Sequence, residues 1–257
     1  MKVFIVKRNS VLFYIIMFIA AFGVIFTRWD NAAYVFNNNS DLNNLPIYCV
    51  DKGDEKICAI SFDAAWGNED TDELIRILDE YKIKTTFFVV GSWVDKFPES
   101  VKALSDAGHE IMNHSDTHPH MTKISEDAME SELENCDTKI QKITGVRPTL
   151  FRPPYGDYNS DVIQKTDECN HYTIQWSVDS LDWKDLSAAQ ITERVTSNIH
   201  PGAIVLFHNA AKNTPEALPQ ILDTLISDGY KIVPVSKLIM KNNFTIDHTG
   251  KQISKAS

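Results

Sequence analysis

The sequence predicts an α/β domain built on a parallel sheet, because short apolar runs alternate with longer amphipathic ones along most of the chain. The short runs are rich in β-branched and aromatic residues and are mostly bounded by turn residues, as strands are. The longer runs carry apolar residues at helical spacing. A series of βα units indicates a parallel sheet, which either closes into a barrel of seven units or stays open and doubly wound. The chain has no glycine-rich phosphate loop, so the nucleotide-binding form of the open sheet has little support.

The order of these elements follows directly from the pattern. The expected strands are 57–62, 85–90, 109–113, 149–152, 172–177, 203–207 and 231–235. The expected helices are 71–81, 125–144, 187–199 and 215–227. In the first helix Leu74, Ile77 and Leu78 share one face. The last helix has Pro215 in its first turn, where proline is tolerated.

The amino-terminal segment predicts export. Lys2, Lys7 and Arg8 precede an uncharged apolar run at 11–27. The run is at the short limit of a membrane span, and positive charges before it favour an amino terminus that stays in the cytoplasm. An uncleaved signal-anchor over residues 1–28, with the rest of the protein outside the membrane, is the first interpretation. A cleaved signal peptide and a secreted protein is the second.

The remaining chain divides into three expected parts. An asparagine-rich linker covers 29–56, one domain covers 57–241, and a polar carboxy-terminal tail covers 242–257. The domain is long enough to bury a sizeable core, and we expect a monomer. The net charge of -10 argues against a nucleic-acid partner. The four cysteines form no CxxC pair, so we expect no thiolate metal site, and disulfides stay unassigned.

Chemically active residues follow five of the expected strands. They are Asp63, the pair His114 and His118, the segment Arg152–Gly156, the segment Asp179–Trp183, and His208. The carboxyl ends of parallel strands form the face on which barrel enzymes build their active sites. The five clusters are therefore expected to converge on one site.

The histidine pair suggests a metal site that lacks one ligand. A hydrolytic metal ordinarily has three protein ligands and an open position for water. His114 and His118 are spaced as ligands, and Asp63 offers a carboxylate. The residue beside Asp63 is Ala64, which offers no donor.

These five motifs, in this order and spacing, resemble the polysaccharide deacetylases of carbohydrate esterase family four. The resemblance runs from about Ile57 to about Val235 and is strongest to the sporulation-associated deacetylases of spore-forming bacteria, whose first motif also reads FDxxWG. It implies a distorted (β/α)7 barrel. The implied reaction is metal-assisted removal of N-acetyl groups from amino sugars of a cell-wall polysaccharide, peptidoglycan or chitin-like. The implied cofactor is a divalent metal, zinc first, with cobalt or manganese as alternatives.

The resemblance assigns the metal and base positions residue by residue. Asp63 matches the general base, and Ala64 stands where the family has a metal-binding aspartate. His114 and His118 match the histidine ligands, and Arg152 matches the arginine that holds the base.

The remaining positions match the acid and the substrate contacts. His208 matches the general acid and Asp182 the carboxylate that tunes it. Tyr155 matches the residue whose backbone N–H stabilises the oxyanion, and Trp183 and Leu206 match the apolar walls around the acetyl methyl group. Amide hydrolysis needs an activated water, an oxyanion stabiliser and an acid for the departing amine, so this set of residue types suits the reaction.

Three consequences of Ala64 stay open at this point. Asp63 serves as both base and third ligand, or a nearby group such as His120, Asn68 or Glu69 replaces the missing acid. In the third case the metal is lost and the domain binds glycan without cleaving it. The intact acid and base positions favour a hydrolase over such a pseudoenzyme. A structural, membrane-anchored coat or wall protein would show neither binding nor turnover.

Overall fold

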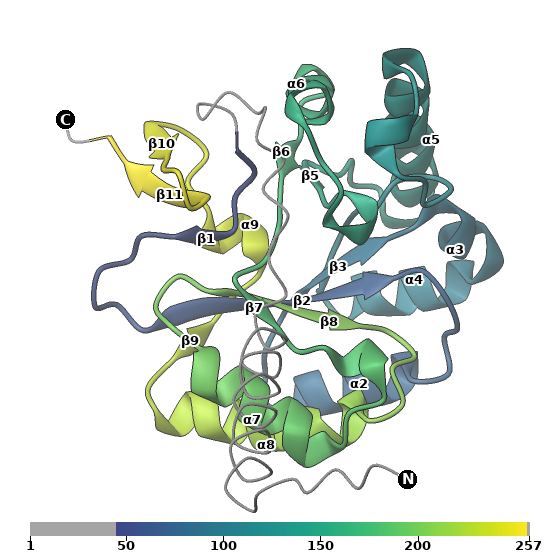
Figure 1. Ribbon diagram of the computed structural model, residues 1–257. Coiled ribbons are helices and arrows are strands. Elements are labelled where there is room, and N and C mark those ends of the chain that lie inside the picture. Colours follow the sequence, from purple (N-terminus) through teal and green to yellow (C-terminus); the bar gives the residue numbers. More distant parts are fainter. Residues whose placement is uncertain (1–44, 256–257) are drawn as a thin grey trace, which may run out of the picture. The chain divides into compact units, whose positions relative to one another are not determined.

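The computed structural model describes residues 45–255, and these form a curled parallel sheet covered by helices (Figure 1). The strands of the sheet are β2 (Ile57–Ala64), β3 (Thr86–Val89), β4 (Glu110–Asn113), β5 (Leu150–Phe151), β6 (Tyr172–Thr173), β7 (Val178–Asp179), β8 (Ile204–His208) and β9 (Lys231–Ile232). They lie in the order β6-β5-β4-β3-β2-β8-β7, and β9 pairs with the start of β2. Every pairing given for this sheet is parallel. The arrangement is consistent with the expected distorted (β/α)7 barrel, with β6 and β7 as the two ends of the strand path.

The helices form a layer that follows the strand order. They are α2 (Thr71–Glu80), α3 (Gly91–Lys96), α4 (Pro98–Asp106), α5 (Glu126–Thr144), α6 (Ser160–Glu168), α7 (Ala188–Asn198), α8 (Thr214–Ser227) and α9 (Val235–Leu238). Each helix contacts the next one in the order α7, α8, α2, α4, α5 and α6. Figure 1 shows α7, α8 and α2 together beneath β2 and β8. The helix order thus follows the strand order, with α8 beside α2 just as β8 pairs with β2.

Strand β2 is the centre of the molecule, and every one of its residues is buried. Cys58, Ile60 and Phe62 pack into the core cluster beneath the helices, whereas Ile57 and Ala59 belong to the cluster on the other face. Successive side chains of a strand point to opposite faces. The same alternation places Ser61 and Asp63 on the face of Ala59, away from the helix-side core.

The four expected helices are present within one residue at each end, and their termini have the expected signals. The Ser125 hydroxyl accepts a bond from the Ala128 amide, 3.3 Å away, at the start of α5. Gly145 ends that helix with φ of 74°, a left-handed conformation that glycine adopts without strain. Ser187 and Gln190 form a reciprocal capping box at the start of α7.

Helices α3, α4, α6 and α9 were not expected from the sequence. Helices α3 and α9 have only 6 and 4 residues, too short for a helical period to stand out. The expected strand at 172–177 is also shorter than predicted, because β6 ends at Thr173 and β7 begins at Val178.

Two expected boundaries differ from the structure. Residues 45–50 were assigned to the linker, yet Leu45, Ile47 and Val50 are buried, and β1 (Cys49–Val50) pairs with β11 (Lys251–Ser254). The expected tail contains β10 (Phe244–Ile246), which pairs antiparallel with β11. The Asp247 carboxylate closes the turn between these strands by accepting from the Thr249 and Lys251 amides.

The membrane segment and the cysteines are the last two features that the sequence raised. Within residues 45–255 no helix is long and apolar enough to cross a membrane. The expected signal-anchor lies outside these described residues. The four cysteines all lie inside them and are free and buried.

Candidate active site

The base position is a buried ion pair at the carboxyl end of β2. Arg152, which follows β5, donates through Nη1 to Asp63 Oδ1 over 2.7 Å, and both side chains are almost fully buried. Burial alone raises the pKa of Asp63, but Arg152, His114 and His208 outweigh it, so the pKa lies below the ordinary value of 3.8. Asp63 is therefore ionised at neutral pH and held in one orientation.

The guanidinium of Arg152 is itself fixed from several sides. Its Nη2 donates to Ser61 Oγ at 2.9 Å and to the Gln175 carbonyl at 3.2 Å. Its carbon Cζ lies 4.2 Å from the centre of the Phe88 ring, a cation–π contact. Ser61 and Gln175 were missed by the sequence reasoning. Ser61 had a signal, since it is a polar residue two positions before Asp63 in an otherwise apolar strand.

The two histidines of the predicted metal site lie side by side, with ring centres 5.0 Å apart. His114 Nδ1 lies 2.7 Å from the Arg152 carbonyl, so it donates there and leaves Nε2 as the acceptor. His114 Nε2 is 3.5 Å from Asp63 Oδ2. Burial lowers the pKa of His114, and it lowers the pKa of His118 to about 4. Both imidazoles are consequently neutral at pH 7, the state in which histidine binds a metal.

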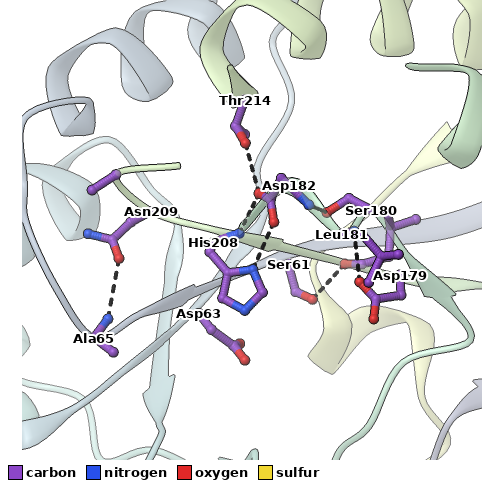
Figure 2. Close-up of polar contacts among 12 residues, drawn as sticks. Ser61, Asp63, Ala65, Asp179, Ser180, Leu181, Asp182, His208, Asn209 and Thr214 are labelled. Atoms are coloured by element: carbon purple, nitrogen blue, oxygen red, sulfur yellow. Dashed lines mark hydrogen bonds and ion pairs between the residues drawn. The ribbon is translucent and has the colours of Figure 1, made fainter. Parts of the chain in front are cut away.

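The acid position is formed by His208, the last residue of β8, and Asp182. Asp182 Oδ1 lies 2.8 Å from His208 Nδ1, and Oδ2 accepts from the His208 amide and the Thr214 hydroxyl at 2.8 Å each. Figure 2 shows these three contacts converging on Asp182, with Asp63 close to His208. Burial lowers the pKa of His208, but Asp182, Asp63 and Asp179 outweigh it, and the pKa lies above 6.5. Thr214 was not expected from the sequence.

Two exposed aromatic residues contact histidines of the site. Trp66 stacks on the His208 ring with centres 5.5 Å apart, and Tyr155 stacks on His120 at 4.3 Å. Trp66, Tyr155 and Trp183 are the large aromatic side chains exposed to solvent among the described residues. Leu206, by contrast, is buried within β8.

The loop that carries Trp66 is held by Asn209, which the sequence reasoning also missed. The Asn209 amide nitrogen donates to the carbonyls of Trp66 and Gly67, at 2.6 and 2.8 Å. Its oxygen accepts from the Ala65 amide at 3.3 Å (Figure 2). Asn209 follows His208 directly, so one segment carries the residue at the acid position and fixes the loop that contains Trp66.

The donor set falls short of a complete three-residue metal site. Ala64 is fully buried in the helix-side core cluster. Residues 45–255 contain no group of three or more His, Cys, Asp or Glu arranged to hold a metal ion. The residues present therefore match two of the three protein ligands that a hydrolytic metal ordinarily has, and Asp63 is the nearest carboxylate.

The nearby groups considered as substitutes have other partners. His120 Nδ1 lies 3.3 Å from Asp157 Oδ2 and its ring stacks on Tyr155. The Asn68 side chain donates to Ser100 Oγ at 3.0 Å, and Glu69 accepts from the Asn68 backbone. Asp63 is thus the better candidate for a third ligand.

Comparison with known proteins agrees with this geometry. Residues 51–174 match the family model described as polysaccharide deacetylase. The chain is 34% identical over 196 residues to the uncharacterized protein YlxY of Bacillus subtilis, covering 76% of this chain and 60% of that protein. It is 32% identical over 184 residues to the peptidoglycan-N-acetylglucosamine deacetylase of Bacillus cereus, and the match covers 70% of this chain and 67% of that protein.

Solved structures include both active and inactive relatives. The wild-type BA3943 protein of Bacillus anthracis, a CE4 family pseudoenzyme, superposes with a TM-score of 0.73 at 33% identity, covering 83% of this chain and 74% of that one. A BA3943 mutant with restored enzymatic activity also has a TM-score of 0.73, at 36% identity. This match covers 77% of this chain and 72% of that one. The matched motifs, the curled parallel sheet and these similarities lead to one conclusion: the chain belongs to the polysaccharide deacetylase family, carbohydrate esterase family four.

Proposed function

We propose that this protein is an N-deacetylase that hydrolyses the acetamide groups of amino sugars in a cell-wall polysaccharide, peptidoglycan or a chitin-like polymer. One observation carries the proposal: a carboxylate with a lowered pKa and an imidazole with a raised pKa lie on adjacent strands of the same site. Asp63 and His208 are register partners on β2 and β8, and their pKa values are shifted in opposite directions. Two neighbouring groups whose pKa values are shifted in opposite directions can serve as a general base and a general acid, here Asp63 and His208 respectively.

The residues of the chain account for the proton transfers of the reaction. Asp63, oriented by Arg152, takes a proton from the attacking water as its oxygen adds to the amide carbon. His208 gives its proton to the nitrogen as the C–N bond breaks, because an amine leaves readily only once protonated. Acetate and a free amino sugar are released. Asp182 holds the imidazole through Nδ1 and stabilises its charge, leaving Nε2 to face the substrate.

His114 and His118 would hold a divalent metal, with zinc the first choice and cobalt or manganese as alternatives, and Asp63 would be the third ligand. When bound, such a metal acidifies water and polarises a carbonyl oxygen. Losing one of three ligands costs several kcal/mol of affinity, judged against structural zinc sites worth roughly 10 kcal/mol or more. We therefore propose weak metal binding by the wild-type protein. Tyr155 would offer its backbone N–H to the oxyanion, and Trp183 and Leu206 would surround the acetyl methyl group.

The proposed setting follows from the amino-terminal sequence. The basic residues and the apolar run at 11–27 support a membrane-anchored protein whose domain lies outside the cytoplasm, or a secreted one if the segment is cleaved. A role in spore formation is supported by the sequence resemblance alone.

Acetate release tests the proposed reaction. The full chain is incubated with peptidoglycan or chitooligosaccharides and zinc, cobalt or manganese, and acetate is measured enzymatically. Asp63→Asn and His208→Ala should each abolish release, whereas His248→Ala removes an exposed imidazole outside the site and should leave it unchanged. No release by the wild type with any of these metals contradicts the proposal.

Ala64→Asp tests the proposed metal position. A carboxylate at this fully buried position is costly unless a cation pairs with it. The variant should therefore lose thermal stability without metal and gain more from zinc than the wild type does. Unchanged zinc affinity would contradict the placement of the metal position beside residue 64.

A glycan-binding pseudoenzyme is the second candidate function. Ala64 and the incomplete donor set favour it, as does the similarity to a CE4 pseudoenzyme. It predicts saturable binding of chitooligosaccharides, no acetate release by the wild type, and release by Ala64→Asp.

A further inference from the structure

The loop between the two histidines has a backbone that its own sequence does not favour. Ser115 and His118 both have left-handed conformations, with φ of 68° and 61°, although neither is glycine. Such residues persist only where the surrounding structure holds them. The position of the His118 imidazole therefore depends on what holds this loop.

The first half of the loop is held by strand β4 and helix α3. Asn113 Oδ1 accepts from the Ser115 amide at 2.7 Å. The carbonyls of Ser115 and Asp116 accept from the amides of Gly91 and Ser92, at 2.9 and 2.8 Å. These contacts secure the part of the loop that follows His114.

The second half is held chiefly by helix α5. Lys139 of this helix donates to Asp116 Oδ1 at 2.6 Å, and within the loop Ser115 Oγ accepts from the His118 amide at 3.0 Å. Glu132 is the side chain of α5 that binds the loop backbone. Glu132 Oε2 accepts from the amides of Asp116 and Thr117, at 2.8 and 2.7 Å, and Oε1 accepts from the Thr117 hydroxyl at 2.6 Å. Hydrogen bonds to an ionised acceptor are stronger than neutral ones. One carboxylate thus uses both oxygens on the two residues that immediately precede His118.

We propose that Glu132 is a positioning residue that sets the place of His118 relative to His114 and thereby the affinity of the histidine pair for a divalent metal. The proposal rests on the metal-binding role given to the pair under the proposed function. Glu132 itself contacts the loop backbone and is not a ligand. Its removal should free the Asp116 and Thr117 amides and let the His118 ring turn away from His114.

Three substitutions separate positioning from a general loss of stability. Glu132→Gln keeps a side-chain oxygen that can accept from the backbone amides of Asp116 and Thr117. It also places its side-chain NH2 group near the Thr117 hydroxyl. Glu132→Asp keeps the charge but shortens the side chain, and Glu132→Ala removes all three bonds. Glu130→Ala is the matched control, since Glu130 is an exposed glutamate of the same helix.

Two measurements on the full chain decide the proposal. Zinc affinity is measured by competition with a chelating dye, and exchange of the amides of residues 115–118 is measured by hydrogen–deuterium exchange without metal. Glu132→Ala and Glu132→Asp should weaken zinc binding by about 10- to 100-fold, the usual effect of losing a group that orients a ligand. Both should speed amide exchange, whereas Glu132→Gln and Glu130→Ala should stay close to the wild type.

The outcomes distinguish this inference from the proposed function. Wild-type zinc affinity in Glu132→Asp, or unchanged exchange at residues 116 and 117, overturns the positioning role. Because neither readout uses turnover, absence of acetate release leaves the inference standing. A wild type that binds no zinc overturns the link to metal affinity, which rests on the role proposed for the histidine pair.

Discussion

Replacing Asp182 by asparagine should lower the pKa of His208 and so weaken the proposed acid. Asp182 is buried and makes its 2.8 Å contact to Nδ1 as a carboxylate. A hydrogen bond to a charged group contributes about 1.5–3 kcal/mol and a neutral one about 0.5–1.5 kcal/mol. The asparagine retains a neutral bond, so the difference is on the order of 1 kcal/mol, or roughly one pKa unit.

The assay is a proton NMR titration of the His208 ring in the free protein, with the signal assigned by its absence in His208→Gln. Thr214→Val is the control, because it removes one bond to Asp182 without changing the charge. It should shift the His208 pKa much less. An unchanged or higher His208 pKa in Asp182→Asn would refute the assignment of Asp182 as the group that raises it.

The same substitution should change how stability depends on pH. The pKa of His208 is raised in the folded state, so its contribution to stability is fully present below the unfolded value of about 6.5 and is lost as pH rises through the folded pKa. Asp182→Asn should remove much of this loss between neutral and mildly alkaline pH. Urea denaturation at several pH values measures it.

Three further predictions concern stability. Arg152→Met leaves the buried Asp63 carboxylate unpaired and should lower the free energy of unfolding by about 3–5 kcal/mol, measured by urea denaturation; a loss below 1 kcal/mol would contradict the pairing. Asn209→Ala removes the bonds that hold the Trp66 loop and should cost about 1–3 kcal/mol, with faster deuterium exchange at residues 65–67 as the direct check. Burial lowers the pKa of His109 to about 4, so its protonation in the unfolded state should reduce stability as pH falls from 6.5 to 4; His109→Gln should flatten that slope, and an unchanged slope would exclude this residue as its source.

Much of the fold was predictable because its signals are local. The long helices have an apolar face and recognisable caps, such as Ser125 and the Ser187–Gln190 pair. The inner strands are short apolar runs bounded by turns. The carboxy-terminal hairpin was missed because its strands have only 3 and 4 residues and its pairing partner, β1, lies about two hundred residues earlier in the chain.

The main site residues and two of their pairings were predictable, but the residues that support them were not. The motifs placed Asp63, Arg152, His114, His118 and His208 at the carboxyl ends of four parallel strands, which lie on one face of the sheet. Ser61, Gln175, Thr214, Asn209 and Glu132 had no motif of their own. Apart from Ser61, whose polarity in an apolar strand was a signal, they became visible only through the side chain or backbone that each one contacts in the folded chain.

The sequence by itself determined the fold class, the family resemblance and the missing acid at Ala64, since all three depend on residue types and their spacing. The resemblance implied the pairs Asp63–Arg152 and Asp182–His208, and the tertiary structure gave their geometry. Only the tertiary structure decided that Glu132 holds the loop before His118. These contacts join residues far apart in the chain across neighbouring strands and a helix. Burial, charge and hydrogen-bond geometry set the protonation of each group, and they arise only when the chain has folded.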